Sequence, residues 1–140
     1  MNFNRTLAAL AAACTLTPAF ASAADLTVQV TGLEEASGTI YVALFDEAGW
    51  STNSAVGTAR IDVTDAAPSA QFEDLAPGTY GVKLFQDLNG DGELALGKFG
   101  IPSEPYGFSN DAPVRFGPPR FSDAGFELTD TGASQTITLR

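Results

Sequence analysis

Short runs in which apolar and polar residues alternate, separated by turn residues, constrain the fold of this 140-residue chain more than any other feature. In the first run, Leu26, Val28 and Val30 share one face, and 38–45 repeats the pattern. A repeat of two residues is the period of a β-strand with a buried face. The second run is apolar on its other face as well, which predicts a central strand covered on both sides.

Five more segments have strand character: 58–63, 70–72, 78–86, 124–128 and 135–139. Turn residues separate them, and no segment carries a convincing helical stripe. The sequence therefore predicts an all-β fold, an antiparallel β-sandwich of about seven strands that is immunoglobulin-like or transthyretin-like. One long loop, 87–121, interrupts the strand pattern, and its many aromatic residues predict that it is ordered.

The N-terminus has the outline of a signal peptide. Arg5 supplies a positive start, 7–20 is apolar apart from small and hydroxyl residues and one proline, and small side chains follow at 21–23. Small residues at these last positions are what signal peptidase requires. We expect cleavage between Ala23 and Ala24 and delivery of the protein to the periplasm or beyond.

Cleavage would divide the chain into a signal peptide, 1–23, and a single β-sandwich domain, 24–140. Lipidation at Cys14 is disfavoured, because the apolar segment before it is short and the preceding alanines lack the large aliphatic residue of a lipoprotein box. No later apolar run approaches the roughly 20 residues of a spanning helix, so we expect a chain that does not span a membrane.

The residue inventory excludes several enzyme chemistries. The chain has no histidine, which excludes Ser-His-Asp triads and histidine-ligated zinc, and its one cysteine, Cys14, would leave with the signal peptide. A carboxylate-based glycan hydrolase, using two of Glu104, Asp111 and Asp123, is the remaining catalytic alternative and the least favoured function.

The chain is acidic, with 17 acidic and seven basic residues and a formal net charge of −10. Loss of Arg5 with the signal peptide would make the mature domain more negative still. Such a field repels nucleic acid and anionic lipid and attracts cations. A solvated acidic surface with no specific partner is the plainer explanation of the same charge.

The segment 75–80, Leu-Ala-Pro-Gly-Thr-Tyr, is a turn that enters a strand at Tyr80. It is similar to the tyrosine corner of immunoglobulin-like and fibronectin-like sandwiches, in which the tyrosine hydroxyl bonds to upstream backbone. Similar segments occur in transthyretin-like and collagen-adhesin B-type domains. Tyr80 is therefore expected to have a structural role.

A candidate calcium loop follows the strand 78–86. Asp87, Asn89 and Asp91 place side-chain oxygens at alternate positions, Gly92 permits a sharp turn, and Glu93 would offer its main-chain carbonyl. Calcium takes six to eight oxygen ligands, and this spacing is the first half of an EF-hand-like loop. Calcium is the one cofactor that the sequence suggests.

The second half of that loop departs from the pattern. Ala95 occupies the ninth position, and Lys98 stands where a bidentate glutamate would close the coordination shell. A complete site would need water or a remote carboxylate, from Glu104, Asp111 or Asp123. The alternative is a plain Asn-Gly and Asp-Gly turn with no ion.

The remainder of loop 87–121 offers a candidate binding surface. Its proposed ligand-binding residues are Tyr106, Phe108, Asn110, Arg115 and Arg120. Aromatic faces would stack on a ligand, and the amide and guanidinium groups would supply polar contacts. The alternative is that the aromatic rings plug one end of the sandwich and that the arginines pair with neighbouring carboxylates.

Several motifs between residues 78 and 121 resemble a family of exported bacterial proteins known as domain of unknown function 2141. These motifs are Gly78-Thr79-Tyr80, Phe85-Gln86-Asp87, Asn89-Gly90-Asp91-Gly92, Gly100-Ile101-Pro102, Tyr106-Gly107-Phe108-Ser109-Asn110 and Phe116-Gly117-Pro118-Pro119. The resemblance implies a sandwich fold and export, and it supplies no catalytic residues. Family members often have aspartate at the position of Ala95, so a shared ion site would be weaker in this chain.

Two functions are favoured over the glycan hydrolase. The preferred one is a non-catalytic exported binding module of the cell envelope, stabilised by calcium, that presents loop 87–121 to a glycan, peptide or protein. The alternative is a structural envelope protein in which the loop is a packed cap. Binding predicts exposed rings at Tyr106 and Phe108 and free arginines, whereas a structural role predicts buried rings and paired arginines.

Overall fold

The structure, a computed structural model, describes residues 22–64 and 67–140. Residues 1–21 lie outside the described residues. They include Cys14 and all of the expected signal peptide except residues 22 and 23. The first strand begins at Ala24, so removal of residues 1–23 would take nothing from it. Among the described residues, no helix has the length and apolar character needed to cross a membrane.

The described chain is mostly β-structure, with eight strands and two short helices. The strands are β1 (Ala24–Thr31), β2 (Thr39–Phe45), β3 (Gly57–Asp62), β4 (Ser69–Leu75), β5 (Gly78–Asp87), β6 (Tyr106–Phe108), β7 (Phe126–Leu128) and β8 (Ala133–Thr138). The helices are α1 (Glu47–Thr52) and α2 (Phe121–Ala124), and single 3₁₀ turns lie at Lys98–Gly100 and Ser109–Asp111.

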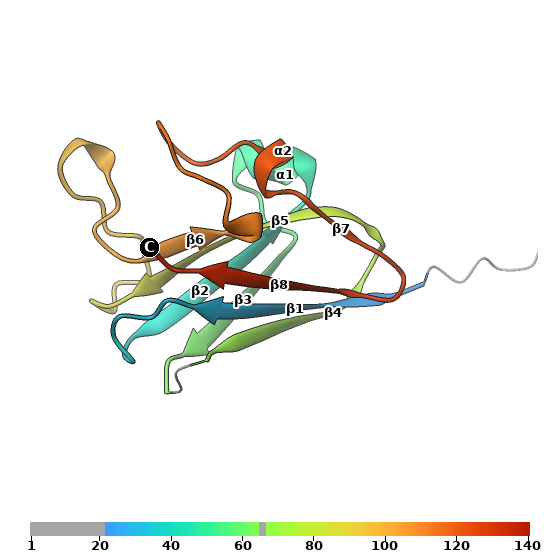
Figure 1. Cartoon of the computed structure of the whole chain (residues 1–140), viewed down its shortest axis with the longest axis horizontal. Coiled ribbons are helices and arrows are strands. Elements are labelled where there is room, and N and C mark those ends of the chain that lie inside the picture. The colour runs from blue at the N-terminus through green and yellow to red at the C-terminus, as the bar shows by residue number, and fades with distance from the viewer. Residues whose placement is uncertain (1–21, 65–66) are drawn as a thin grey trace, which may run out of the picture.

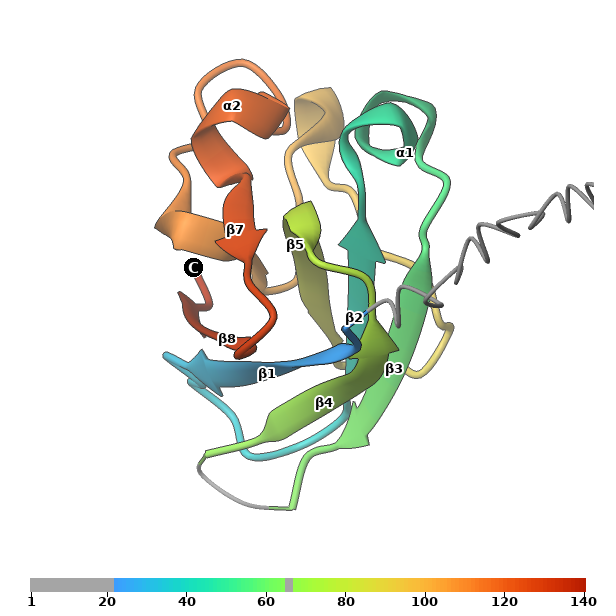
Figure 2. The same cartoon turned by 90° about the vertical axis from the view of Figure 1, so that its right-hand side faces the viewer.

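The strands form two sheets that pack face to face, so the predicted β-sandwich is confirmed (Figures 1 and 2). The smaller sheet has the order β4-β1-β8. The larger has the order β3-β2-β5-β6, and β7 joins it beside β6 on the same edge of β5. Strand β6 lies inside the segment that was predicted to be loop, since three residues are too few to show a period of two.

One pairing departs from the antiparallel prediction. β1 and β8 run parallel, with Leu26 opposite Ala133 and Thr31 opposite Thr138. Parallel neighbours need a long connection, and here nearly the whole domain lies between the two strands. Alternation along a strand shows which face is buried, but not which strand lies beside it or in which direction.

The main core lies between the sheets and is built from the alternate residues that the sequence pattern marked. Leu26, Val28, Ile40, Leu44 and Val82 are each at most 1 % exposed and belong to one continuous cluster. Removal of such side chains from water is the main favourable contribution to folding, worth about 1.5–3 kcal/mol for each fully buried one.

A second cluster covers the outer face of the larger sheet. It includes Phe45, Trp50, Phe108 and Ala124, and α1 supplies the tryptophan. The helix starts at Asp46, whose Oδ1 accepts a 2.7 Å hydrogen bond from the amide of Gly49, as an N-cap residue does. Six residues are too short for a helical stripe to be visible in the sequence.

The turn before β5 has the expected local bond. The hydroxyl of Tyr80 donates a 2.7 Å hydrogen bond to the carbonyl oxygen of Ala76, four residues upstream. The ring also packs against the main core. This arrangement fixes the point at which β5 begins, and β5 in turn positions the residues of the candidate site.

Candidate functional site

Loop 87–121 consists of several ordered pieces. An acidic turn follows β5, a hairpin spans 95–103, β6 returns along the edge of β5, and a second irregular loop, 112–120, leads into α2. The acidic turn and the two loops lie on different parts of this surface.

Asp87 closes the acidic turn from inside the protein. It is only 2 % exposed, and its two carboxylate oxygens accept hydrogen bonds of 2.7 Å from the amide of Gly90 and 2.8 Å from that of Gly92. Ionised acceptors form stronger bonds with backbone amides than neutral ones do. Asp87 thus stabilises the turn directly.

The other residues of the candidate calcium loop continue this pattern on the exposed side. The Oδ1 of Asn89 accepts from the amide of Asp91 at 3.1 Å, and the Oδ1 of Asp91 accepts from the amide of Glu93 at 2.9 Å. Within residues 22–64 and 67–140 there is no cluster of three or more acidic, histidine or cysteine side chains arranged to hold a metal. Calcium binding stays a prediction.

The three remote carboxylates lie in different places, and Asp123 lies 3.6 Å from the guanidinium of Arg120. Glu104 is buried and accepts from the amides of Leu88 and Ala95, both at 2.9 Å, so it ties the two ends of the acidic turn together. Asp111 accepts from the amide of Thr138 at 2.8 Å. Each of these two carboxylates, which the sequence offered for an ion or for hydrolysis, binds backbone amides.

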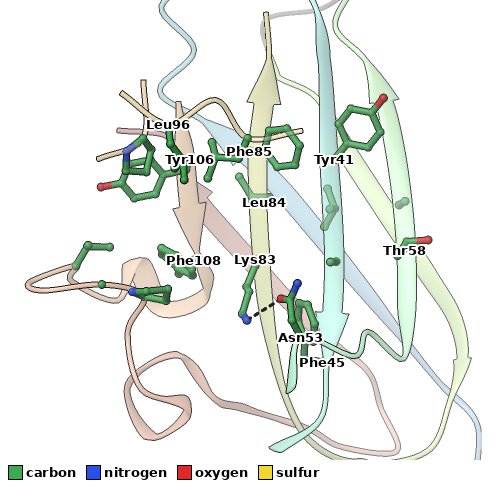
Figure 3. Close-up of a pocket in the computed structure, with 18 of the residues that line it drawn as sticks. Tyr41, Phe45, Asn53, Thr58, Lys83, Leu84, Phe85, Leu96, Tyr106 and Phe108 are labelled. Atoms are coloured by element: carbon green, nitrogen blue, oxygen red, sulfur yellow. Dashed lines mark hydrogen bonds between the residues drawn. The ribbon is translucent and has the colours of Figure 1, made fainter. Parts of the chain in front are cut away.

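An apolar groove of about 560 Å³ lies on the outer face of the larger sheet. Tyr41 of β2, Phe85 of β5 and Tyr106 of β6 contribute to its floor, and Figure 3 shows them on neighbouring strands. The rings of Tyr41 and Phe85 stack with centres 5.3 Å apart. Residues of the hairpin 95–103 and of loop 112–120 form the walls.

Lys83 provides the ammonium group of this groove. Its Nζ donates to the carbonyl oxygen of Trp50 at 3.0 Å and to the Oδ1 of Asn53 at 3.2 Å (Figure 3 draws the second bond). The same atom lies 4.4 Å and 4.5 Å from the ring centres of Phe45 and Trp50, within the range of a cation–π contact. Burial lowers the pKa of Lys83 below its ordinary value of 10.5.

No carboxylate pairs with Lys83 in the part of the chain that the structure describes. The ion pairs found there are Arg60 with Asp62 and Arg120 with Asp123, both near the surface. An ammonium group has three N–H donors, and the described protein accepts from two of them. The third N–H is left for another acceptor.

The five proposed ligand-binding residues divide into three groups. Tyr106 and Phe108 line the groove, the first half-buried and the second 9 % exposed. Asn110 instead donates to the carbonyl oxygens of Asp123, in α2, and of Gly125, directly after α2, and so ties the turn Ser109–Asp111 to the end of that helix. Arg115 and Arg120 lie at the surface.

The two arginines border a second, more polar pocket of about 510 Å³ beside the groove. Arg120 lies 3.6 Å from the carboxylate of Asp123 but remains 85 % exposed. Arg115 is exposed and has no ion pair among the described residues. The partly buried rings are the feature expected of a structural role, and the largely free arginines are the feature expected of a binding role.

Sequence reasoning missed Tyr41, Lys83 and Phe85 as site residues. The sequence predicts strands at 38–45 and 78–86, and the second apolar face of 38–45, which holds Tyr41, indicates packing rather than a site. A lysine in the middle of such a strand was the available signal, because lysine is rarely buried unless it is paired.

The comparisons with known proteins give a family and no activity. The profile of a bacterial family described as "Uncharacterized protein conserved in bacteria (DUF2141)" matches residues 28–137. No curated protein matches the chain. No solved structure matches it either.

Proposed function

Because this chain belongs to the bacterial family DUF2141, which has no described activity, we propose its function from the site: it is a non-catalytic, exported binding module of the cell envelope. Its binding site is the groove beneath loop 87–121. The ligand is an amphipathic small molecule with an apolar body and one carboxylate. Lys83, a half-buried cation without a carboxylate partner among the described residues, is the observation that carries this proposal.

The size and lining of the groove support a small apolar ligand. Its volume of about 560 Å³ lies within the range of roughly 300–1,000 Å³ that is usual for small-molecule sites. Stacked aromatic faces and aliphatic loop residues dominate its surface. A glycan would leave many hydroxyl groups without partners there, which favours an amphipathic ligand over the glycan that the sequence suggested.

The surroundings of Lys83 support a carboxylate as the polar end of that ligand. The ammonium is held in place by Trp50 and Asn53 and sits against aromatic rings, so little side-chain entropy is lost when an anion arrives. Attraction between opposite charges is stronger in a poorly solvated groove than in water. A carboxylate would also accept the third N–H.

The test is a titration of the purified protein with decanoate and with decanol, which have the same apolar chain and different head groups. Trp50 is the only tryptophan, and its ring lies beside Lys83, so its fluorescence reports on the groove. We expect saturable binding of both, with decanoate tighter. Lys83→Met should weaken decanoate at least about tenfold and leave decanol nearly unchanged, since a charged hydrogen bond contributes about 1.5–3 kcal/mol.

The matched control is Lys98→Met, which makes the same change at an exposed lysine outside the groove. It should leave both titrations unchanged. Ala43→Phe, which adds a large side chain to the groove floor, should weaken both ligands. Failure of either ligand to bind saturably would contradict the proposal.

A structural role in the envelope is the second candidate, favoured by the burial of Phe108 and by the hydrogen bonds that fix Asn110. It predicts no saturable binding of decanoate or decanol. The groove-filling variant Ala43→Phe should then lower the stability of the protein and have no effect in the titrations. The same titrations therefore separate the two functions.

A further inference from the structure

The two loops that wall the groove carry the same short motif. It reads Lys98-Phe99-Gly100-Ile101-Pro102 in the hairpin and Arg115-Phe116-Gly117-Pro118-Pro119 in the second loop. In each, a basic residue precedes a phenylalanine, and a glycine and a later proline follow. Phe99 is 98 % exposed and Phe116 is fully exposed.

The hairpin tip holds the Phe99 side chain outward in a strained backbone conformation. Phe99 has a φ of 62°, in the left-handed region that a bulky residue rarely occupies. Hydrogen bonds from Gly97 to Ile101 (2.7 Å) and from Ser103 to Ala95 (2.8 Å) fix the tip in that shape. Because the exposed ring gains no packing in return, folding alone does not account for this residue.

The second tip is anchored to the rest of the protein as well. The Nε1 of Trp50 donates a 3.0 Å hydrogen bond to the carbonyl oxygen of Pro119. Gly100 and Gly117, which directly follow the two exposed phenylalanines, both line the groove. Figures 1 and 2 show the two loops projecting from the same side of the molecule, so both tips stand beside one groove.

The charge of the tips is opposite to that of the chain. Segments 95–103 and 112–120 contain Lys98, Arg115 and Arg120 and no acidic residue, whereas the whole chain has a net charge of −10. Charges farther away than about 10 Å are largely screened at physiological salt. Arg120 lies 3.6 Å from the carboxylate of Asp123, whereas Lys98 and Arg115 have no ion pair among the described residues. The positive charge of the tips therefore comes from Lys98 and Arg115.

We propose that the two tips dock the protein on an anionic lipid bilayer, with Phe99 and Phe116 inserted at the interface and Lys98 and Arg115 against the headgroups. Exposed aromatic rings flanked by basic side chains are the composition of a surface that lies in a membrane interface. The groove then opens toward the lipid. Docking does not require the groove to bind a ligand.

The test is flotation of the purified protein with vesicles of phosphatidylglycerol, compared with vesicles of phosphatidylcholine. The protein should float with phosphatidylglycerol at low salt, and added salt should release it. Lys98→Gln and Arg115→Gln should each weaken binding about fivefold, because a basic residue near an anionic surface contributes about 1 kcal/mol. Arg60→Gln, on strand β3 and outside the two loops, is the matched control.

The phenylalanines separate docking from folding. The double variant Phe99→Asn/Phe116→Ser should no longer float with the vesicles. Its thermal stability should be equal to that of the parent or higher, because asparagine adopts the left-handed backbone conformation of position 99 more readily than phenylalanine does. Val56→Ser, at a side chain that is 50 % exposed elsewhere, is the apolar control and should float normally.

Three results would overturn the proposal: no flotation of the parent protein, equal flotation with both lipids, or equal loss in the Val56→Ser control. Lys83→Met, which removes the charge of the groove, should float as the parent does. A failure of the groove to bind decanoate would thus leave docking intact, and a failure of docking would leave the decanoate titration intact.

Discussion

The side chain of Lys83 donates a 3.0 Å hydrogen bond to the carbonyl oxygen of Trp50 and lies 4.5 Å from the centre of the same residue's ring. A single ammonium therefore ties the middle of β5 to the last turn of α1. It remains only partly solvated and without a carboxylate partner in the described chain.

This arrangement predicts how stability changes at alkaline pH. Burial lowers the pKa of Lys83 in the folded protein below 10.5, its value in the unfolded chain. Between these two values the unfolded chain binds more protons, so stability rises with pH. Lys83→Met should abolish this contribution, and urea unfolding of both proteins up to pH 10.5 measures it. Parallel stability curves for parent and variant would show that Lys83 titrates as an ordinary lysine.

Asp87 should contribute far more to stability than Asp91, although both belong to the same turn. Asp87→Asn exchanges a buried carboxylate that accepts from two amides for a neutral group, and we expect a loss of about 1.5–3 kcal/mol. Asp91→Asn changes an exposed residue and should cost less than about 1 kcal/mol. Urea unfolding in the presence of a chelator compares them, and equal losses would contradict the role given to Asp87.

Calcium should raise the melting temperature of the parent protein if the candidate loop binds it. An ion that binds only the folded state adds about 2.7 kcal/mol at 100 times its Kd. The increase should disappear in Asp87→Ala and Asp91→Ala and be absent with chelator. Identical melting temperatures with and without millimolar calcium would contradict the calcium prediction. The predicted difference in stability between Asp87→Asn and Asp91→Asn would not be affected, because it is measured with chelator present.

Gly107 should not tolerate a side chain, because β6 and β8 approach closely there. A Cβ at Gly107 would lie 2.6 Å from the Cγ2 of Ile137 and 3.2 Å from the carbonyl oxygen of Thr138. Gly107→Ala should cost about 1–3 kcal/mol, as other overpacked cores do. Gly78→Ala is the control, since its nearest neighbour would be 3.8 Å away. Equal melting temperatures for the two variants would contradict the close packing.

The sequence predicted the strands well, because their information is local. The alternation of Leu26, Val28 and Val30 depends on neighbours in the chain, and all three are buried. The pairing of β1 with β8 depends on residues more than one hundred positions apart, and no local pattern encodes it. The same holds for β6, which is recognisable only once β5 lies beside it.

The candidate site was harder to predict for a related reason. Tyr41, Lys83 and Phe85 have the same period of two as core residues, and only tertiary structure shows that loops cover their face incompletely. Asn110 carried a plausible ligand-binding chemistry, and the structure shows it bonded to backbone that is distant in sequence. Residue type identifies what a side chain can do, whereas the fold determines what lies within its reach.

Strand β5 is hydrogen-bonded along both edges, to β2 on one side and to β6 and β7 on the other. The surface below the groove is therefore fixed by the backbone of the whole sandwich, while the surface above it consists of two loops that are each joined to the framework at a few points. Because of this division, the two loops can vary in sequence more than the strands can. Substitutions in the loops could change the size and shape of the molecule that is accommodated with little effect on folding, much as antigen-binding loops diversify on a constant scaffold.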